Sequence, residues 1–349
     1  MVLIFLFLSL LKGQNNTIFP GFTGAELLDS LVVHYKPQSV LSYADARDTL
    51  FSKIYTLDDS LHCVYSDFTI WMDPSQDPNT WAYNNGIDTE HTWPQSKGAV
   101  GNAKSDMHHL YATRIQVNSA RGSDPFAEVP DTNTDRWFRK TQVLTTIPNT
   151  NIDEYSERDD NSALFEPRED HKGNVARAMF YFYTMYKEEA NTADPNFFQL
   201  QKSELLNWHR KDPADSLESV RTSLIAPYQD NCPNPFILDS SLVRRAYFTD
   251  PTEIGSQKNS AVKRFVLYQN YPNPFNPNTV FSFQLAVGNH VTLEIYSLSG
   301  QKIYTLLSDF RHAGFHTFEF NASDLASGIY IYRLQAGSEV VIKKMMLLK

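Results

Sequence analysis

The chain has 349 residues, of which 42% are hydrophobic and 20% are charged. This is a globular composition, and the length suits two domains better than one. The net charge of −9 is uneven, because residues 263–349 hold eight Lys and Arg against five Asp and Glu, which leaves −12 for residues 1–262. An acidic first part counts against an extended basic surface for nucleic acid, so such a function must rest on a few specific residues.

An apolar run opens the chain, VLIFLFLSLL at residues 2–11. It is too short to cross a membrane and suits the core of a signal peptide, so residues 1–13 are predicted to direct export. The alternative is an ordinary buried strand or helix, because no basic residue precedes the run. No other stretch could span a membrane, and we expect no stable span in the mature protein. Export would permit a disulfide between the two cysteines, Cys63 and Cys232.

Residues 14–249 are predicted to form the first domain, with helices in its later part. The clearest helix is 171–190, where Val, Ala, Met, Phe and Tyr recur at helical spacing and form one apolar stripe. Further helices are predicted over 197–209 and about 215–226. Residues 250–262, DPTEIGSQKNSAV, are polar and rich in turn formers, as in a linker.

Residues 263–349 alternate apolar and polar side chains in short runs that Gly, Asn and Asp turns separate. The runs include VTLEIYSL (291–298), HTFEFNA (316–322), GIYIYRLQA (328–336) and VVIKKMMLL (340–348). Strands at this spacing predict a small all-β, immunoglobulin-like sandwich. The alternative function for such a sandwich is carbohydrate binding or adhesion.

The residues that suggest chemistry begin at the end of a predicted strand. Residues 87–91, IDTEH, are expected to form a strand that stops before Pro94, and residues 108–112 can return as a second strand. Neighbouring strand residues point to opposite faces of a sheet. Glu90 and His91 can therefore serve one site only where the pleat breaks, and the strand end is such a place.

A short helix is predicted over 114–121, directly after the second strand. Thr113 is a candidate N-cap, and Gln116 stands three residues further on, as in a capping box. Gly122 can take the position just past the end of the helix. The segment therefore predicts two strands followed by a helix of about two turns.

One face of this helix carries Arg114, Asn118 and Arg121, because these residues recur at helical spacing. Glu90 and Asn118 supply the oxygen ligands that a hard divalent cation prefers. A neutral His91 can take a proton from an attacking water, and the two arginines can bind phosphate. The set predicts the metal-assisted hydrolysis of a phosphodiester.

Each of these residues also has an ordinary structural explanation. A histidine at a strand end is more often a hydrogen-bonded part of the fold, and Asn in a short helix is usually a cap. His108 and His109 suggest a zinc hydrolase, but neighbours on a strand cannot easily face one ion, and zinc needs three or four ligands. His108 is expected to orient the hairpin instead. A non-catalytic protein that binds nucleic acid or a surface is the remaining alternative.

Several segments together resemble the bacterial endonuclease I family of His-Me finger (ββα-metal) nucleases, over about residues 60–249. They are EHTWPQSKG, SDMHHL, VNSARG, FEPREDHKGNVARAMFYFYTMY, LLNWHRKDPAD and NPF, in that order. The resemblance implies an α+β fold in which His91 is the general base and Glu90 and Asn118 bind Mg²⁺, with Mn²⁺ or Ca²⁺ as other possible ions. It also implies cleavage of DNA and RNA without strong sequence preference, leaving 5′-phosphate ends.

One segment departs from the family pattern. Many members carry a long insertion after the Glu-His dipeptide, with an arginine that contacts phosphate, whereas here only 14 residues, 92–105, separate His91 from Asp106. These residues include Lys97 and Lys104 but no arginine. Arg114 and Arg121 are therefore predicted to bind the phosphate and to complete the catalytic set with His91. Together with Lys97 and Lys104 they are expected to form a local positive strip beside His91.

The end of the chain resembles the C-terminal sorting domain of the type IX secretion system, over about residues 265–349. The resemblance rests on YQNYPNPFNPNT, IYSLSGQKI, SGIYIYRLQAG and the closing KKMMLLK. It implies recognition by the type IX secretion machinery of a Gram-negative bacterium and a secreted or cell-surface location. The combined expectation is a monomeric enzyme with domains at 14–249 and 263–349.

Overall fold

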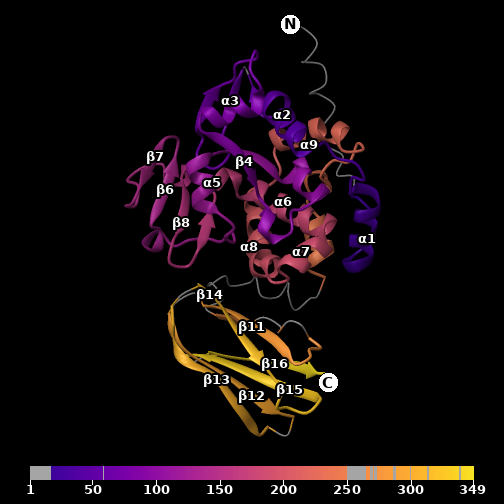
Figure 1. Cartoon of the computed structure of the whole chain (residues 1–349), viewed down its shortest axis with the longest axis vertical. Helices are drawn as coiled ribbons and strands as arrows, with labels where there is room; N and C mark the ends of the chain where they lie inside the picture. The colour runs from indigo at the N-terminus through magenta and orange to yellow at the C-terminus, as the bar shows by residue number, and fades with distance from the viewer. Residues whose placement is uncertain are drawn as a thin grey trace. The chain divides into compact units, whose positions relative to one another are not determined.

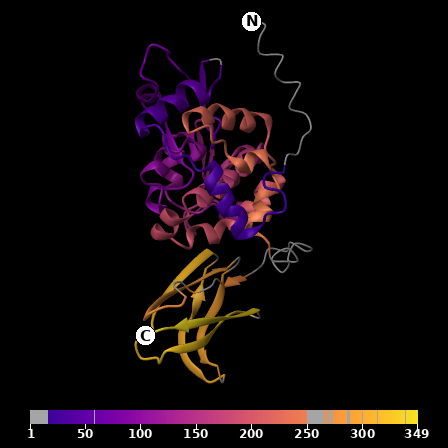
Figure 2. The same cartoon turned by 90° about the vertical axis from the view of Figure 1, so that its right-hand side faces the viewer.

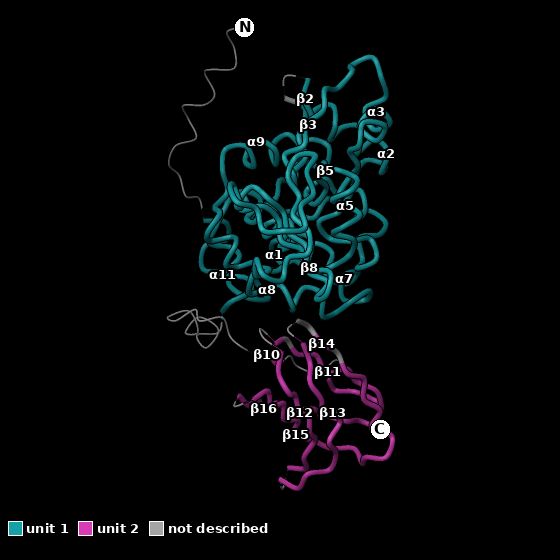
Figure 3. Tube along the Cα trace, turned by 90° about the vertical axis from the view of Figure 1, so that its left-hand side faces the viewer, with its two compact units in different colours: residues 1–254 teal, residues 255–349 magenta. Residues whose placement is uncertain are grey.

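The computed structural model divides the chain into two compact units, residues 1–254 and 255–349, which Figure 3 colours teal and magenta. The structure describes residues 17–57, 59–249, 265–267, 270, 273–285, 288–298, 300–312, 314–337 and 339–349. The predicted signal peptide (1–13) and linker (250–262) lie outside the described residues. The ends assigned to the two domains from the sequence therefore stay predictions.

The first unit is mixed α+β, as predicted, and its helices lie among three small sheets (Figure 1). The helices are α1 (Gly24–Tyr35), α2 (Tyr43–Thr49), α3 (Pro78–Asn84), α4 (Asn102–Ser105), α5 (Ile115–Arg121), α6 (Lys172–Met185), α7 (Lys187–Ala193), α8 (Phe197–Lys211), α9 (Ser216–Ile225), α10 (Pro235–Leu238) and α11 (Leu242–Tyr247). The sheet orders are β1-β2-β3, β4-β5 and β7-β6-β8-β9. Their strands are β1 (Thr56–Leu57), β2 (Ser60–His62), β3 (Thr69–Trp71), β4 (Ile87–His91), β5 (Leu110–Arg114), β6 (Arg136–Arg139), β7 (Gln142–Leu144), β8 (Ser156–Asp159) and β9 (Leu164–Glu166).

The core of this unit is built around α6. The apolar stripe predicted a helix here, and it is confirmed, but the helix ends at Met185 because the backbone of Tyr186 (φ −128°, ψ 39°) leaves the helical region. A separate helix, α7, then follows. The predicted helices over 197–209 and 215–226 are confirmed as α8 and α9.

The β4–β5 hairpin is fixed to this core by a tryptophan. Trp93 lies two residues after the end of β4, and its buried ring stacks on Phe182 of α6 at a centroid distance of 4.7 Å. Its indole nitrogen donates to the carbonyl of Lys97 at 2.7 Å. The strand end that carries Glu90 and His91 is thus held against a rigid helix rather than on a loop.

The second unit is all-β, and Figure 2 gives another view of its strands. Two sheets, β10-β11-β14 and β13-β12-β15-β16, share one apolar core, in which Phe281 and Tyr332 lie 4.7 Å apart. The strands are β10 (Phe265–Leu267), β11 (Asn278–Leu285), β12 (Asn289–Ser297), β13 (Lys302–Arg311), β14 (Gly314–Asn321), β15 (Gly328–Ala336) and β16 (Glu339–Leu347). The predicted β-sandwich is confirmed, and its immunoglobulin-like type stays a prediction.

Membrane-spanning helices are absent from the part of the chain that the structure describes. Each helix there is too short or too polar to cross a bilayer.

Candidate active site

Two antiparallel strands and one helix carry the predicted site residues. β4 pairs with β5 so that Glu90 lies opposite Tyr111 and His91 opposite Leu110. α5 begins immediately after β5 and packs on both strands. The predicted strand–strand–helix order is confirmed.

The details around the second strand differ from the prediction. β5 begins at Leu110, so His108 and His109 lie in a short 3₁₀ turn before it rather than on it. Thr113 is not the N-cap of α5, because it belongs to β5 and pairs with Asp88. Arg114 takes the cap position without a capping side-chain bond. The strand pairing outweighs the local capping signal here, since it continues to the last residue before the helix.

Gly122 ends α5 as expected. Its φ of 59° lies in the left-handed region, which glycine adopts without a steric penalty.

His91 is held by one backbone carbonyl. Its Nε2 lies 3.0 Å from the carbonyl oxygen of Lys104, and because a carbonyl only accepts, Nε2 must carry the proton. The lone pair is then on Nδ1, as a general base requires. Burial lowers the pKa of His91 to about 3, and the charges of His109, Lys104 and Arg121 act in the same direction. His91 is 7% exposed, so at neutral pH it is an uncharged base that water can still reach.

Asn118 presents an amide oxygen beside the hairpin. Its Nδ2 donates to the carbonyl of Thr89 at 3.2 Å, which fixes the amide with Oδ1 as the remaining group. The structure gives this oxygen no hydrogen-bond donor among the described residues. A neutral oxygen held in this way suits a hard divalent cation.

Glu90 lies on the other side of β4 and is only 1% exposed. Tyr65 donates its hydroxyl to Oε1 at 3.1 Å, and Nη1 of Arg121 lies 3.4 Å from the same oxygen. Burial raises the pKa of Glu90 to about 7, although Arg121 and Tyr65 oppose the shift. Both contacts use Oε1. Because β4 stays paired with β5 through His91, the expected break in the pleat between Glu90 and His91 is not found, and the role of Glu90 as a metal ligand stays a prediction.

Arg121 does not share an exposed face with Arg114 and Asn118, contrary to the sequence prediction. The residue is 1% exposed. Its guanidinium donates to the carbonyls of His91 (3.1 Å), Thr92 (2.7 Å) and Gly122 (3.1 Å). Arg121 therefore fixes the end of β4: both terminal nitrogens bind backbone carbonyls, and its remaining Nε is buried away from any phosphate.

Arg114 is accessible but lies far from the base. It pairs with Ile87, four residues before His91 on β4, which is about 13 Å along the strand at about 3.4 Å per residue. Its guanidinium donates to the carbonyl of Lys140 at 3.3 Å and lies over the ring of Phe68. Contact with a phosphate near the reacting bond is not supported by this position.

The two histidines before β5 are structural. His108 Nε2 donates to the carbonyl of Cys232 at 2.8 Å, and His109 Nε2 donates to that of Ala103 at 2.7 Å. Both side chains are completely buried, and burial lowers the pKa of each to about 4. Each ring is held in place by its own backbone acceptor, as expected for His108, and the arrangement gives no support to a zinc site.

These two histidines predict how stability depends on pH. An unfolded chain protonates them below about pH 6.5, whereas the folded protein resists protonation down to about pH 4. The unfolded state therefore binds more protons in this window, and the free energy of unfolding should fall as the pH falls from 6.5 to 4. Urea titrations between pH 7.5 and 5 should show a shallower dependence for His109→Asn than for the wild type. The exposed His62→Asn should keep the wild-type slope, and an unchanged slope in His109→Asn would contradict the assignment.

Among the described residues, one group of carboxylates lies close enough together to hold an ion. Glu128, Glu166 and Glu169 place oxygens within 4.8 Å of one another. Lys172, however, lies at the centre, with Nζ 3.0 Å from Glu128, 2.7 Å from Glu166 and in a short contact with Glu169. The ammonium group offsets part of the negative charge and binds all three carboxylates, so this is an ion-pair network rather than a metal site.

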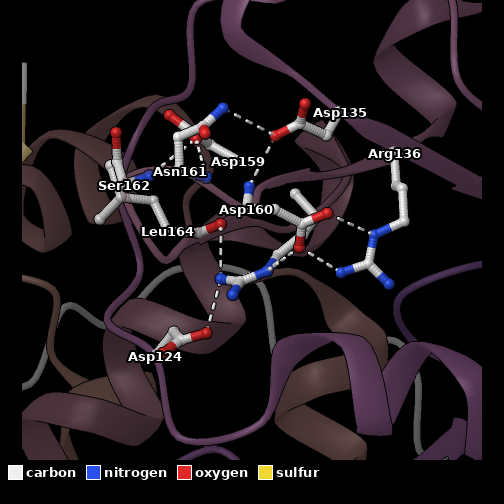
Figure 4. A network of polar contacts seen from close by, with 9 residues as sticks. Asp124, Asp135, Arg136, Asp159, Asp160, Asn161, Ser162 and Leu164 are labelled. Carbon is white, nitrogen blue, oxygen red and sulfur yellow. Dashed lines mark hydrogen bonds and ion pairs between the residues drawn. The ribbon is translucent and has the colours of Figure 1, made fainter.

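A second group of acidic side chains lies at the β8–β9 turn, where the carboxylates bind backbone nitrogens and arginines of the protein itself (Figure 4). Asp159 accepts from the backbone nitrogen of Asn161 at 2.9 Å, and Asp135 accepts from that of Asp160 at 2.8 Å. The carboxylate of Asp160 is also bound by Arg136 and Arg158. These contacts use the carboxylates to form the turn.

The disulfide that export would permit between Cys63 and Cys232 is not formed in the structure. Cys63 and Cys232 are both free thiols in the structure. Cys63 is buried in the small core under the β4–β5 hairpin, while the Sγ of Cys232 lies 3.9 Å from the carbonyl of His34 on α1.

Sequence reasoning named Lys104 but missed three contacts at the site. Tyr65 binds Glu90, the carbonyl of Lys104 orients His91, and the ring of Tyr43 lies 5.4 Å from that of His91. A backbone acceptor leaves no signal in a side-chain pattern. Tyr43 comes from α2, which carries no motif that joins it to the hairpin.

The strand–strand–helix unit therefore carries a buried, uncharged histidine and an amide oxygen that is fixed by one hydrogen bond. The chain belongs to the Endonuclease I family, whose model matches residues 25–241, and it is a nuclease. Residues 269–348 match the secretion system C-terminal sorting domain, so the protein is secreted or displayed at the cell surface. Nucleic acid is its substrate.

Two bacterial relatives and one solved structure are similar to parts of this chain. An "Extracellular ribonuclease" of Bacillus subtilis (strain 168) is 28% identical over 231 residues, covering 62% of this chain and 72% of the relative. An "Extracellular ribonuclease" of Bacillus amyloliquefaciens is 34% identical over 168 residues, 42% of this chain and 49% of the relative. The crystal structure of dimeric latent PorU from Porphyromonas gingivalis covers 25% of this chain and 10% of its own, with 17% identity and a TM-score of 0.21.

Proposed function

We propose that this protein is a secreted, metal-dependent, non-specific endonuclease of the His-Me finger type that acts as a monomer on DNA and RNA and leaves 5′-phosphate ends. The observation that carries the proposal is the 3.0 Å contact between His91 Nε2 and the Lys104 carbonyl. It sets the tautomer that leaves Nδ1 as a base. The family membership and the names of the two relatives support a nucleic-acid substrate that includes RNA.

The proposed mechanism assigns the proton to His91. Nδ1 takes a proton from the water that attacks phosphorus, and the carbonyl of Lys104 stabilises the resulting imidazolium through the Nε2 hydrogen bond. Asn118 Oδ1 and the second carboxylate oxygen of Glu90 would hold Mg²⁺, or Mn²⁺ or Ca²⁺ in its place. When bound, the cation would supply positive charge to the phosphate and the leaving oxygen. Arg121 is a positioning residue, because its guanidinium holds the carbonyl of His91 and the carboxylate of Glu90 in place.

The proposal is tested by nicking of supercoiled plasmid and degradation of a mixed RNA. Cleavage should require Mg²⁺, stop with EDTA and resume with excess Mg²⁺. The 5′ ends of the products should be substrates for a DNA ligase without prior phosphorylation. Binding of DNA without any nicking in Mg²⁺, Mn²⁺ or Ca²⁺ would favour the non-catalytic alternative.

Asn118 gives a metal-specific prediction. Asn118→Ala removes the Oδ1 ligand, so the Mg²⁺ concentration for half-maximal cleavage should rise by about tenfold or more. Asn118→Asp keeps an oxygen there and should show a smaller change. Gln116→Ala is the matched control, because Gln116 is exposed on the same helix. Identical Mg²⁺ titrations for wild type and Asn118→Ala would remove Asn118 from the site.

A further inference from the structure

The ring of Tyr43 gathers two cations beside the catalytic base. The Nζ of Lys104 lies 4.6 Å from the ring centroid, and the guanidinium carbon of Arg47 lies 5.3 Å from it. The ring of His91 lies 5.4 Å from the same ring. Three elements that are distant in sequence, α2, β4 and α4, thus meet at one point, where each cation is held by the negative face of the ring.

Two lysines, Lys97 and Lys104, lie between β4 and β5, and Lys104 on α4 is the one whose charge can bind a ligand. Its ammonium group forms no ion pair among the described residues, and it is close enough to His91 to contribute to the lowered pKa of that residue. Lys97, in the same loop, is already paired with Asp194 at 2.8 Å and lies over the ring of Phe197. Lys104 can therefore offer its positive charge to a phosphate, whereas the charge of Lys97 is already paired with Asp194.

Two contacts with β4 orient the guanidinium of Arg47 without occupying all of its donors. Its Nη2 pairs with Asp88 at 2.7 Å, and its Nε donates to the hydroxyl of Thr89 at 3.1 Å. Thr89 and His91 are two residues apart on β4, so they point to the same face. The side chain remains 19% exposed, and these two contacts leave Nη1 for another acceptor. Asp88 offsets part of its charge, so Arg47 offers a phosphate an oriented donor at Nη1 rather than an unpaired cation.

We propose that Lys104 and Arg47, positioned by the Tyr43 ring, bind a phosphodiester group of the nucleic-acid substrate next to His91. This inference rests on the proposed function. It assigns the phosphate contact to the two cations that the structure places beside the base, in place of Arg114 and Arg121. Lys104 supplies a mobile point charge, and Arg47 supplies fixed donors. The site recognises backbone only, so it adds affinity without sequence preference.

The decisive comparison is Lys104→Met against Lys97→Met. Both keep the backbone carbonyls that hold His91 and Trp93, and both remove one charge from the same loop. Lys104→Met should raise KM for a 20-nucleotide fluorescein-labelled single strand by about tenfold, as expected for the loss of one charge-assisted contact. Lys97→Met should leave KM within about twofold. The kcat of Lys104→Met should change less than its KM, because the base stays in place.

Binding without turnover gives an independent measurement. In a His91→Ala background, Lys104→Met should lower the salt dependence of binding to the same strand by about 0.7 log units per log unit of salt, the value for one phosphate contact. Arg47→Met should also weaken binding, and Arg47→Lys should restore it in part. A Tm close to the wild-type value shows that α2 is intact in these variants. Equal KM values and salt slopes for the Lys104→Met and Lys97→Met proteins would overturn the proposal.

The outcomes separate this inference from the proposed function. If the wild type cleaves nucleic acid with Mg²⁺ but Lys104→Met and Arg47→Met bind like wild type, only the phosphate site is wrong. If the wild type does not cleave under any condition but Lys104→Met still lowers the salt slope, the phosphate site stands and the nuclease mechanism fails.

Discussion

His91→Ala is expected to lower the rate of phosphodiester cleavage by about 10²–10⁴-fold, the usual contribution of a positioned general base. The substitution removes Nδ1, which the contact between Nε2 and Lys104 leaves unprotonated. His109 cannot take over, although its ring lies 5.5 Å from that of His91. It is completely buried, so its unprotonated Nδ1 is not accessible to an attacking water. Single-turnover rates on a labelled duplex at saturating Mg²⁺ measure the effect.

His62→Ala is the control for this prediction. His62 is exposed on β2, with Nδ1 2.9 Å from the hydroxyl of Thr69, and has no role in the proposed site. Its variant should cleave at the wild-type rate, and both variants should give the wild-type far-UV circular dichroism spectrum. Added imidazole should restore part of the activity of His91→Ala. Retention of more than half of the wild-type rate in His91→Ala would refute the assignment of the base.

The strand–strand–helix unit could be predicted because its signals are local. The IDTEH run before Pro94 marks a strand, and the glycine after Arg121 marks the end of a helix. The capping signal at Thr113 failed because β-pairing with Asp88 continues through that residue. A tertiary contact of this kind outweighs a preference worth about 1 kcal/mol.

The orientation of charged side chains was less predictable than their position. Helical spacing places Arg114, Asn118 and Arg121 near one another but cannot tell which of them is buried. The carbonyls at the end of β4 need donors once the strand stops, and Arg121 supplies them. Arg47 and Tyr43 could not be assigned from the sequence, because the contact that brings α2 to β4 spans about forty residues.

The acidic charge of the first unit is compatible with a polyanionic substrate because much of it is neutralised locally. Three glutamates surround Lys172, and Asp160 is bound by Arg136 and Arg158. Beside His91, Lys104 forms no ion pair among the described residues, and Arg47 is offset in part by Asp88. Net charge describes the whole unit, whereas binding depends on the field at the site.

Arg121→Met should destabilise the first unit more than any other substitution considered for the hairpin. It leaves three backbone carbonyls without their donor and leaves the Glu90 carboxylate buried without its cation. Removing one partner of a buried ion pair typically costs about 3–5 kcal/mol. For a unit of this size, each kcal/mol lowers Tm by roughly 2–4 °C, so a decrease on the order of 10 °C is expected. Arg114→Met, which loses one 3.3 Å hydrogen bond at the surface, is the matched control and should change Tm by no more than about 2 °C.

A second substitution separates the two parts of this cost. In the Glu90→Gln, Arg121→Met double variant no buried charge remains, so part of the lost stability should return, while the unsatisfied carbonyls of His91 and Thr92 still lower Tm below the wild-type value. Thermal and urea unfolding of the four proteins in the cycle give the coupling between Glu90 and Arg121. If Arg121 instead bound the substrate, Arg121→Met would keep the wild-type Tm and raise KM. That result would return Arg121 to the phosphate site, and the carbonyls at the end of β4 would then need a different source of stabilisation.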